Sequence, residues 1–234
     1  MTLCALAVFD TPGGATIESR GVGVSIIVLA AGSSRRMGSP KPLLAFDGET
    51  CLSLVLRACL GSRADESVLV LGADAAMIKV ELDQVVARAR REGPLGPKVL
   101  VHEQHERGQT SSLKAGLEAM SGRTDAFVVL PVDHALVTSL EIDSLIARFE
   151  ERPRGRTIFI AAHQGRRGHP VLFAASHRSP VLELADDEPL SDYVRLREGG
   201  VEKVEMDSPW VTAGMNTPEE YQILLAAYRA RVAP

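Results

Sequence analysis

The stretch Val24–Lys41 contains the residues of this chain best suited to phosphate chemistry. Val24–Leu29 is a short apolar and β-branched run, the pattern of a strand buried on both faces. A loop of small residues follows, and then three cations within seven positions, Arg35, Arg36 and Lys41. Small residues let the backbone pass close to a ligand, and the cations beside them favour an anion such as phosphate. A solvated basic loop after a core strand would show the same residues, so both interpretations stand at this point.

Two common phosphate-binding loops do not fit this stretch. No Gly-Lys-Ser/Thr closes the loop, which excludes a Walker A motif. Gly21 and Gly23 precede the strand instead of following it, and no third glycine comes three residues later. The usual dinucleotide-binding fingerprint is therefore excluded as well.

A second polar segment, Gly108–Ser112, lies between an expected strand and an expected helix. Its sequence is Gly-Gln-Thr-Ser-Ser, so hydroxyls and free backbone N–H groups gather at a helix N-terminus. Such groups can meet the edge of a base or an anion. They are equally typical of a plain helix N-cap, and the residues alone favour that simpler interpretation.

Two oxygen-bearing side chains are candidates for a metal site. Asp133 directly follows a buried apolar run, where a carboxylate can bind Mg²⁺ or simply form a turn. Further along, Thr217, Pro218 and Glu220 form the capping-box start of a helix. Asn216 is not needed for that cap, and its carbonyl oxygen can serve as a neutral ligand for Mg²⁺.

Two histidine-containing segments need a functional or a structural interpretation. His102 and His105 form an H-x-x-H pattern, but the spacing is not the HExxH of zinc hydrolases. Because this segment falls in an expected loop, we interpret it as a solvated polar loop. Gly165–Phe173, which contains His169, has the pattern of a tight turn leading into a strand.

Strands and helices are expected to alternate along the chain. Such alternation favours a three-layer α/β/α domain with a mostly parallel sheet, in which ligands bind beyond the carboxyl ends of the strands. The expected strands are Val24–Leu29, Ser67–Leu71, Lys98–Val101, Ala126–Leu130 and Thr157–Ala161. The expected helices are Thr50–Leu60, Ala75–Arg90, Thr110–Met120, Leu140–Phe149 and Pro218–Ala230.

Composition limits the class of protein. The 234 residues are 45% hydrophobic, enough for the core of one α/β domain, and we expect residues 1–22 to form an extension before a domain at 23–234. A net charge of −4 argues against a nucleic-acid partner. No apolar run is long enough to span a membrane. The cysteines Cys4, Cys51 and Cys59 are odd in number and lie in apolar surroundings, so we expect a cytoplasmic protein.

The loop after the first strand resembles a known family. Leu29–Gly38, with Lys41, is similar to the LAAGxSxRMGxxK signature of small nucleotidyltransferases in the MobA-like NTP transferase family. More narrowly it resembles the molybdenum cofactor cytidylyltransferases, and the likeness extends from about Val24 to Tyr221. The resemblance implies a Rossmann-like nucleotidyltransferase fold. It also implies Mg²⁺-dependent transfer of CMP from CTP to the terminal phosphate of a molybdopterin-type cofactor, with release of pyrophosphate.

The resemblance also implies roles for individual residues. Arg36 and Lys41 would act on the phosphates, Asp133 and Asn216 would bind Mg²⁺, and His169, in a GHPVLF segment typical of the branch, would border the acceptor. Ala31 and the Ser111-Ser112 pair would favour CTP over GTP, since the guanylyltransferase branch has LAGG in the first loop. The residues expected to bind the nucleotide are Leu29, Ala30, Ala31, Gly32, Gly72, Gly108, Ser111 and Ser112.

Some features leave the acceptor and the activity open. Where relatives have two acids, this chain has Gly214 and Asn216, which lowers the negative charge at the metal site. One alternative is transfer to another phosphorylated small molecule, such as a sugar or polyol phosphate. Another is a non-catalytic carrier of the molybdenum cofactor. A molybdoenzyme or its chaperone is the protein partner that the resemblance implies.

Overall fold

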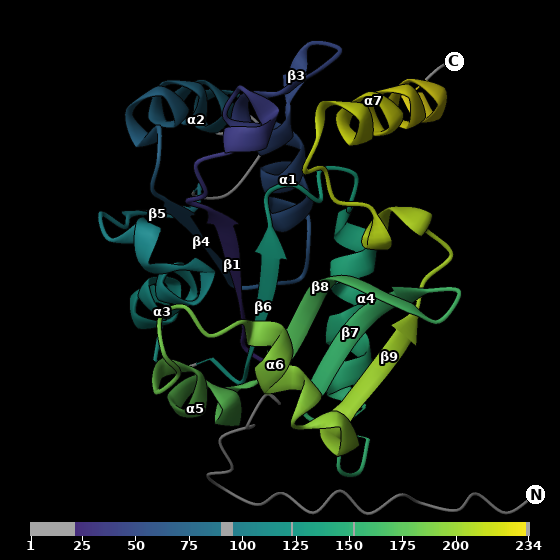
Figure 1. Cartoon of the computed structure of the whole chain (residues 1–234). Coiled ribbons are helices and arrows are strands. Elements are labelled where there is room, and N and C mark those ends of the chain that lie inside the picture. The colour runs from purple at the N-terminus through teal and green to yellow at the C-terminus, as the bar shows by residue number, and fades with distance from the viewer. Residues whose placement is uncertain (1–21, 90–95, 123, 152, 233–234) are drawn as a thin grey trace, which may run out of the picture.

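Strand β1 (Val24–Ala30) lies near the middle of a seven-stranded sheet with the order β5-β4-β1-β6-β8-β7-β9 (Figure 1). The computed structural model describes residues 22–89, 96–122, 124–151 and 153–232. Strand β8 runs antiparallel to both of its neighbours, and the other pairings are parallel. The remaining strands are β4 (Glu66–Leu71), β5 (Lys98–Val101), β6 (Ala126–Pro131), β7 (Ile158–His163), β8 (Arg166–Ala174) and β9 (Val201–Glu205). The expected mostly parallel sheet is therefore confirmed.

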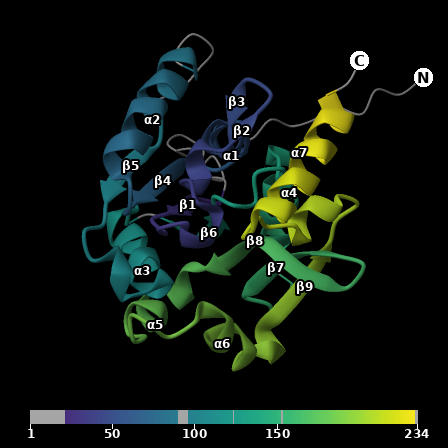
Figure 2. The same ribbon diagram turned by 45° about the horizontal axis from the view of Figure 1, so that its top comes forward.

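Helices cover both faces of the sheet, which confirms the three-layer arrangement (Figures 1 and 2). One face packs against α1, α2, α4 and α7, and the other against α3, α5 and α6. Along β1, Ile26 and Val28 point to the first face, and Ile27 and Leu29 point to the second. A strand with apolar side chains on both faces is stable only between two helical layers. The helices are α1 (Cys51–Leu60), α2 (Ala75–Ala89), α3 (Gln109–Ala119), α4 (Ser139–Glu150), α5 (Arg178–Leu182), α6 (Leu190–Arg195) and α7 (Pro218–Val232).

The long periodic elements agree with expectation to within a few residues. Expected Ala75–Arg90 corresponds to α2, whose last expected residue lies outside the described part of the chain. Residues 1–21 of the extension expected at 1–22, including Cys4, also lie outside the described part of the chain. No helix in the described ranges has both the length and the apolar character needed to cross a membrane.

Five short elements are not expected from the sequence. Helices α5 and α6 have five and six residues, too few for a periodic pattern to emerge. Strand β9 has the sequence VEKVE, whose charges hide its pairing with β7. Strands β2 (Ala45–Phe46) and β3 (Glu49–Thr50) form a hairpin, although Asp47-Gly48 between them is a typical turn signal.

The parallel strands bring their carboxyl ends to one edge of the sheet. The loops after β1, β4, β5 and β6 leave from this edge, and the antiparallel β8 begins there. The cysteine side chains Cys51 and Cys59 are buried in the described structure, and the Cys51 thiol donates to the Val132 carbonyl at 2.9 Å. That bond fixes the loop after β6 against the start of α1.

A glycine in α3 tests how tightly this helix packs on the sheet. A Cβ at Gly116 would lie 2.5 Å from Cγ2 of Ile27 and 3.1 Å from Cγ2 of Val70. We expect Gly116→Ala to lower the free energy of unfolding by about 1–2 kcal/mol, because overpacking costs more than the helix propensity gained. Urea unfolding measures it. Gly122→Ala, where a Cβ meets nothing within 4 Å, is the control and should leave stability nearly unchanged. Equal stability of both variants would contradict the tight packing.

Candidate active site

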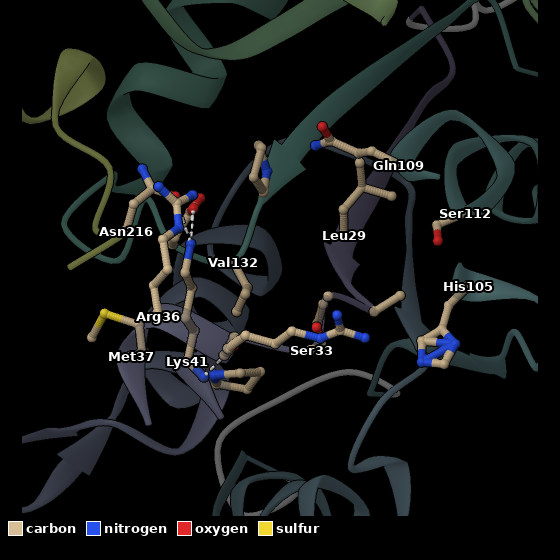
Figure 3. A pocket seen from close by; sticks show the side chains of 18 of the residues that line it. Leu29, Ser33, Arg36, Met37, Lys41, His105, Gln109, Ser112, Val132 and Asn216 are labelled. Carbon is tan, nitrogen blue, oxygen red and sulfur yellow. Dashed lines mark hydrogen bonds and ion pairs between the residues drawn. The ribbon is translucent and has the colours of Figure 1, made fainter. Parts of the chain in front are cut away.

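A cavity of about 610 Å³ opens at the carboxyl edge of the sheet, within the usual size range of a small-molecule site (Figure 3). It is formed by the loop after β1, by the loops after β5 and β6, and by Asn216 before α7. The expectation that ligand-binding loops converge at this edge matches the position of the cavity. The expected site residues among those that line it are Leu29, Ala30, Ala31, Gly32, Arg36, Lys41, Gly108, Ser112, Asp133 and Asn216.

The loop after β1 folds back so that Lys41 faces the cavity. Ser34 has a φ of 48°, in the left-handed region, and its hydroxyl accepts the backbone N–H of Lys41 at 3.0 Å. Its carbonyl accepts the N–H of Met37 at 2.9 Å, which closes a short 3-10 turn at Arg35–Met37. Within the described residues, neither Arg35 nor Arg36 forms an ion pair. Their charge is therefore available to an anion in the cavity.

The ammonium of Lys41 joins the two expected metal ligands. Its Nζ donates to Oδ2 of Asp133 at 2.7 Å and to Oδ1 of Asn216 at 2.9 Å. The Lys41 and Asp133 side chains are only 17% and 18% exposed. A charged hydrogen bond with so little solvent contact holds both groups firmly in place. Figure 3 shows Lys41, Arg36 and Asn216 together at one end of the cavity.

The same two oxygens fit part of a magnesium site. Both converge on the point where the Lys41 ammonium lies, and oxygen is the ligand that Mg²⁺ prefers. Among the described residues there is no cluster of three His, Cys, Asp or Glu side chains able to hold a metal. Asp133 and Asn216 would therefore share the ion with phosphate oxygens and water, as Mg²⁺ at nucleotide sites commonly does.

The space beside Gly214 is filled by a histidine. A Cβ at Gly214 would lie 3.1 Å from Nε2 of His134, so an acidic side chain there would press against the imidazole. The His134 ring also packs edge-on against His169, with the ring centroids 4.7 Å apart. Burial lowers the pKa of His134, and it lowers the pKa of His169 to about 3. Both imidazoles are consequently neutral at pH 7 and add no charge beside Asp133.

Three expected site residues do not line the cavity. His169 lies against His134 behind Asp133. Gly72 lies beneath His105: a Cβ there would be 2.6 Å from the imidazole and 2.7 Å from the Ala31 carbonyl, so glycine is required for close packing. The Ser111 hydroxyl is buried and bonded to Nε2 of His102 at 2.5 Å. At the N-terminus of α3, Ser112 therefore lines the cavity, whereas the Ser111 hydroxyl is bonded to His102 and does not.

The opposite end of the cavity is formed by Gln109, Ser112 and His105 (Figure 3). His105 and Glu106 line the cavity. The sequence predicts a solvated polar loop for the H-x-x-H segment that contains His102 and His105. That interpretation needs correcting for His105, whose Nδ1 is buried without a hydrogen-bond partner in the described structure. Its place after the carboxyl end of β5 was the signal that could have identified it.

A comparison with models of known protein families shows which family this chain belongs to. The model for the MobA-like NTP transferase domain matches residues 26–203, well over half of the sequence. The chain belongs to this family. The resemblance found in the first loop is thereby confirmed at the level of the MobA-like family.

Two curated relatives and one solved structure show how the MobA-like family varies. The chain is 26% identical to the purine catabolism protein PucB of Bacillus subtilis over 205 residues, covering 86% of this chain and 95% of PucB. It is 29% identical to nicotine blue oxidoreductase of Paenarthrobacter nicotinovorans, covering 86% and 96%. The crystal structure of Rv0371c from Mycobacterium tuberculosis has a TM-score of 0.72 at 25% identity, covering 88% of this chain and 99% of that one. The different names of these relatives show that family membership leaves the substrate open.

The contact of Lys41 with both oxygens predicts competition with a metal ion. We expect Lys41→Met to raise the affinity for Mn²⁺, used as a probe without nucleotide, on the order of 10-fold, because Asp133 loses its paired cation. Titration followed by the electron paramagnetic resonance of free Mn²⁺ measures this. Lys79→Met, on the exposed face of α2, is the matched control and should leave the affinity unchanged. Equal affinities for all three proteins would place the ion away from Asp133 and Asn216.

Proposed function

We propose that this protein is a Mg²⁺-dependent cytidylyltransferase that transfers CMP from CTP to the terminal phosphate of a molybdopterin-type cofactor. Membership in the MobA-like NTP transferase family supports nucleotidyl transfer as the class of reaction. The choice of CTP and of the acceptor rests on the residues in the cavity and on the motif in the first loop.

The observation that carries the proposal is the division of one cavity into two chemically different ends. Arg36 and Lys41 form a cationic end beside the oxygens of Asp133 and Asn216. Gln109 and Ser112, with the backbone around Ala31, form a polar end at which the Glu106 carboxylate also lines the cavity and from which Arg36 and Lys41 are remote (Figure 3). A nucleoside triphosphate has the same division between its phosphates and its base.

The reaction needs no protein nucleophile. An oxygen of the acceptor phosphate attacks the α-phosphorus of CTP, a new P–O bond forms, and the bond to the β-phosphate oxygen breaks to release pyrophosphate. The attacking oxygen is already anionic, so the protein must chiefly align two anions and stabilise the charge that develops on the leaving group. Lys41 is suited to the second task because a lysine ammonium is a compact point charge.

Asp133 and Asn216 would hold Mg²⁺, which when bound supplies further positive charge to the phosphates. Lys41 then has two alternative anionic partners, the Asp133 carboxylate and the triphosphate. The ammonium donates to Asp133 and Asn216, and phosphate oxygens in the cavity would offer it a further anionic partner. The neutral Asn216 makes an exchange between these partners easier than a second carboxylate would.

We assign base selection and acceptor binding to opposite sides of the group formed by Lys41, Asp133 and Asn216. Ala31 and Ser112 line the cavity at the end assigned to the base, and both belong to the motifs that favour CTP. His169 lies within the antiparallel strand β8, and its ring packs against His134, the residue that follows Asp133. From there it would support the acceptor side indirectly, by holding His134 in place behind the metal ligand.

Release of pyrophosphate tests the proposal directly. The protein is incubated with Mg²⁺ and CTP, GTP or ATP, each with a molybdopterin-type acceptor or with a sugar or polyol phosphate. We expect release with CTP and the molybdopterin-type acceptor, at a rate at least about 10-fold above that with GTP. Equal use of GTP would contradict the assignment of the base. Turnover with a sugar phosphate and not with the molybdopterin-type compound would identify a sugar phosphate as the acceptor. Tight binding of the molybdopterin-type compound without turnover would indicate a carrier.

Asp133 provides the second test of this mechanism. We expect Asp133→Asn to reduce Mg²⁺-dependent turnover by roughly 10²–10³-fold, because the variant loses the only charged ligand assigned to the ion. Its far-ultraviolet circular dichroism should match the wild type, since Asp133 lies in a loop. Asp83→Asn, exposed on α2, is the matched control. Turnover of Asp133→Asn at the wild-type rate would show that the metal is held elsewhere.

A further inference from the structure

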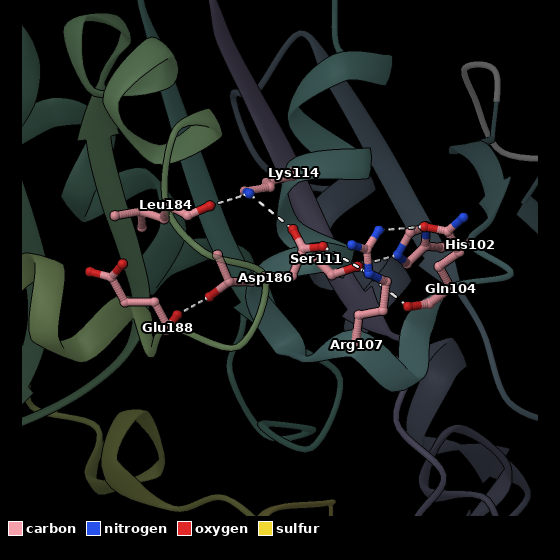
Figure 4. A network of polar contacts seen from close by, with 9 residues as sticks. His102, Gln104, Arg107, Ser111, Lys114, Leu184, Asp186 and Glu188 are labelled. Carbon is pink, nitrogen blue, oxygen red and sulfur yellow. Dashed lines mark hydrogen bonds and ion pairs between the residues drawn. The ribbon is translucent and has the colours of Figure 1, made fainter.

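The segment Leu184–Glu188 lies across the N-terminus of α3, at the end of the cavity assigned to the base (Figure 4). The Asp186 carbonyl accepts the backbone N–H of Ser111 at 3.2 Å, and the Glu188 carbonyl accepts the Thr110 hydroxyl. These carbonyls occupy donors at the helix N-terminus that would otherwise be free for a ligand. The segment thus supports the start of α3 from outside the cavity.

The approach of the two backbones is unusually close at Gly108. Its φ is +136°, and a Cβ there would lie 2.4 Å from the Asp186 carbonyl oxygen. A side chain would therefore both strain the backbone and push the segment away from α3. Gly108 also lines the cavity, so this close approach lies directly at the cavity wall.

The Asp186 carboxylate connects two parts of the cavity wall. Oδ1 accepts a hydrogen bond from Lys114 Nζ on α3 at 2.9 Å, and Oδ2 pairs with Nε of Arg107 at 3.0 Å. Lys114 also donates to the Leu184 carbonyl. The hydrogen bond from Lys114 lowers the pKa of Asp186, so the carboxylate stays ionised at neutral pH.

Arg107 connects the Asp186 carboxylate to a segment that lines the cavity. It is the last residue of the short 3-10 helix η3 (His105–Arg107), whose first two residues line the cavity. Asp186 itself does not line the cavity. η3 and α3 adjoin through Gly108, and the Ser111 hydroxyl bonds to His102 just before η3. The Asp186 carboxylate adds a contact to each element from outside the cavity, and the base would have to fit between His105 on one and Ser112 on the other.

We propose that Asp186 is a positioning residue for the nucleobase, holding the two walls of the base end in register through Lys114 and Arg107. The proposal rests on the nucleotide-binding function proposed above and adds to it a residue outside the cavity. The phosphate end is formed by other segments and does not depend on this contact.

The solvent exposure of the network separates this role from a general role in stability. Arg107 is 61% exposed, so its ion pair with Asp186 adds little to the stability of the fold. Lys114 is only 18% exposed, but Asp186→Asn keeps an oxygen that can accept its hydrogen bond. Loss of the Asp186 charge should therefore leave the protein folded while the two walls lose their register.

Binding of two ligands, one with a base and one without, tests the proposal. We expect Asp186→Asn to weaken CTP binding by roughly 10-fold, as indirect displacement of a pocket wall does. Binding of inorganic tripolyphosphate with Mg²⁺ should change less than about 2-fold, because it contacts only the phosphate end. In turnover, KM for CTP should rise while kcat is retained. Isothermal titration calorimetry measures both affinities.

Two further variants make the result decisive. Asp187→Asn removes a neighbouring exposed carboxylate and should leave both affinities unchanged. Arg107→Met removes only the η3 side of the contact, so it should weaken CTP binding in the same direction even if Asp186→Asn does not fold. Unchanged CTP affinity in Arg107→Met and Asp186→Asn, or an equal loss of CTP and tripolyphosphate binding, would overturn the proposal. If the wild type prefers another nucleoside triphosphate, the assignment of CTP fails, and the same comparison with that nucleotide still tests Asp186.

Discussion

The site depends on one ammonium shared between two loops that are distant in sequence. Lys41 contacts Asp133, 92 residues away, and Asn216, 175 residues away. These contacts are possible because β1 and β6 pair in parallel and therefore end at the same edge of the sheet. The Lys41 charge balances the carboxylate in a place with little solvent, where an unpaired Asp133 would be costly. A ligand that displaces this pair must offer contacts at least as favourable, so the pair links the loop after β1 energetically to Asp133 and Asn216.

The uncharged residues Gly214 and Asn216 agree with this balance. With a single carboxylate at the centre, one ammonium is sufficient to neutralise it. His134 fills the space next to Gly214, and its burial keeps it uncharged. The local electrostatics therefore favour one cation between Asp133 and Asn216, either Lys41 or a metal ion, instead of a cluster of acids holding several ions.

The two ends of the cavity are supported by different kinds of structure. The phosphate end follows directly from strand ends in the middle of the sheet, where the backbone is held by pairing on both sides. The base end lies between η3 and α3, which adjoin through Gly108 and are contacted in addition by Asp186 from a segment without regular structure. Paired strands fix the positions of the charged side chains that follow them. A short 3-10 helix has weaker internal hydrogen bonds, so a contact such as that of Asp186 with Arg107 contributes more to its position.

Residue patterns alone predict the long strands and helices, and they also place Lys41 and Asp133 at one edge of the sheet. Buried strands such as Val24–Ala30 and periodic helices carry their own local signal, and the rule of carboxyl ends then brings Lys41 and Asp133 to one edge. Asn216 follows no expected strand, so the family resemblance, and not this rule, assigned it to the site. Tertiary structure alone decided the base end. Whether Ser111 or Ser112 faces the cavity, whether His105 is solvated, and whether Asp186 meets Arg107 and Lys114 all depend on contacts between segments remote in sequence. Short elements such as α5, α6 and β9 have no such local signal, because they are stabilised by the surfaces they pack against and not by their own periodicity.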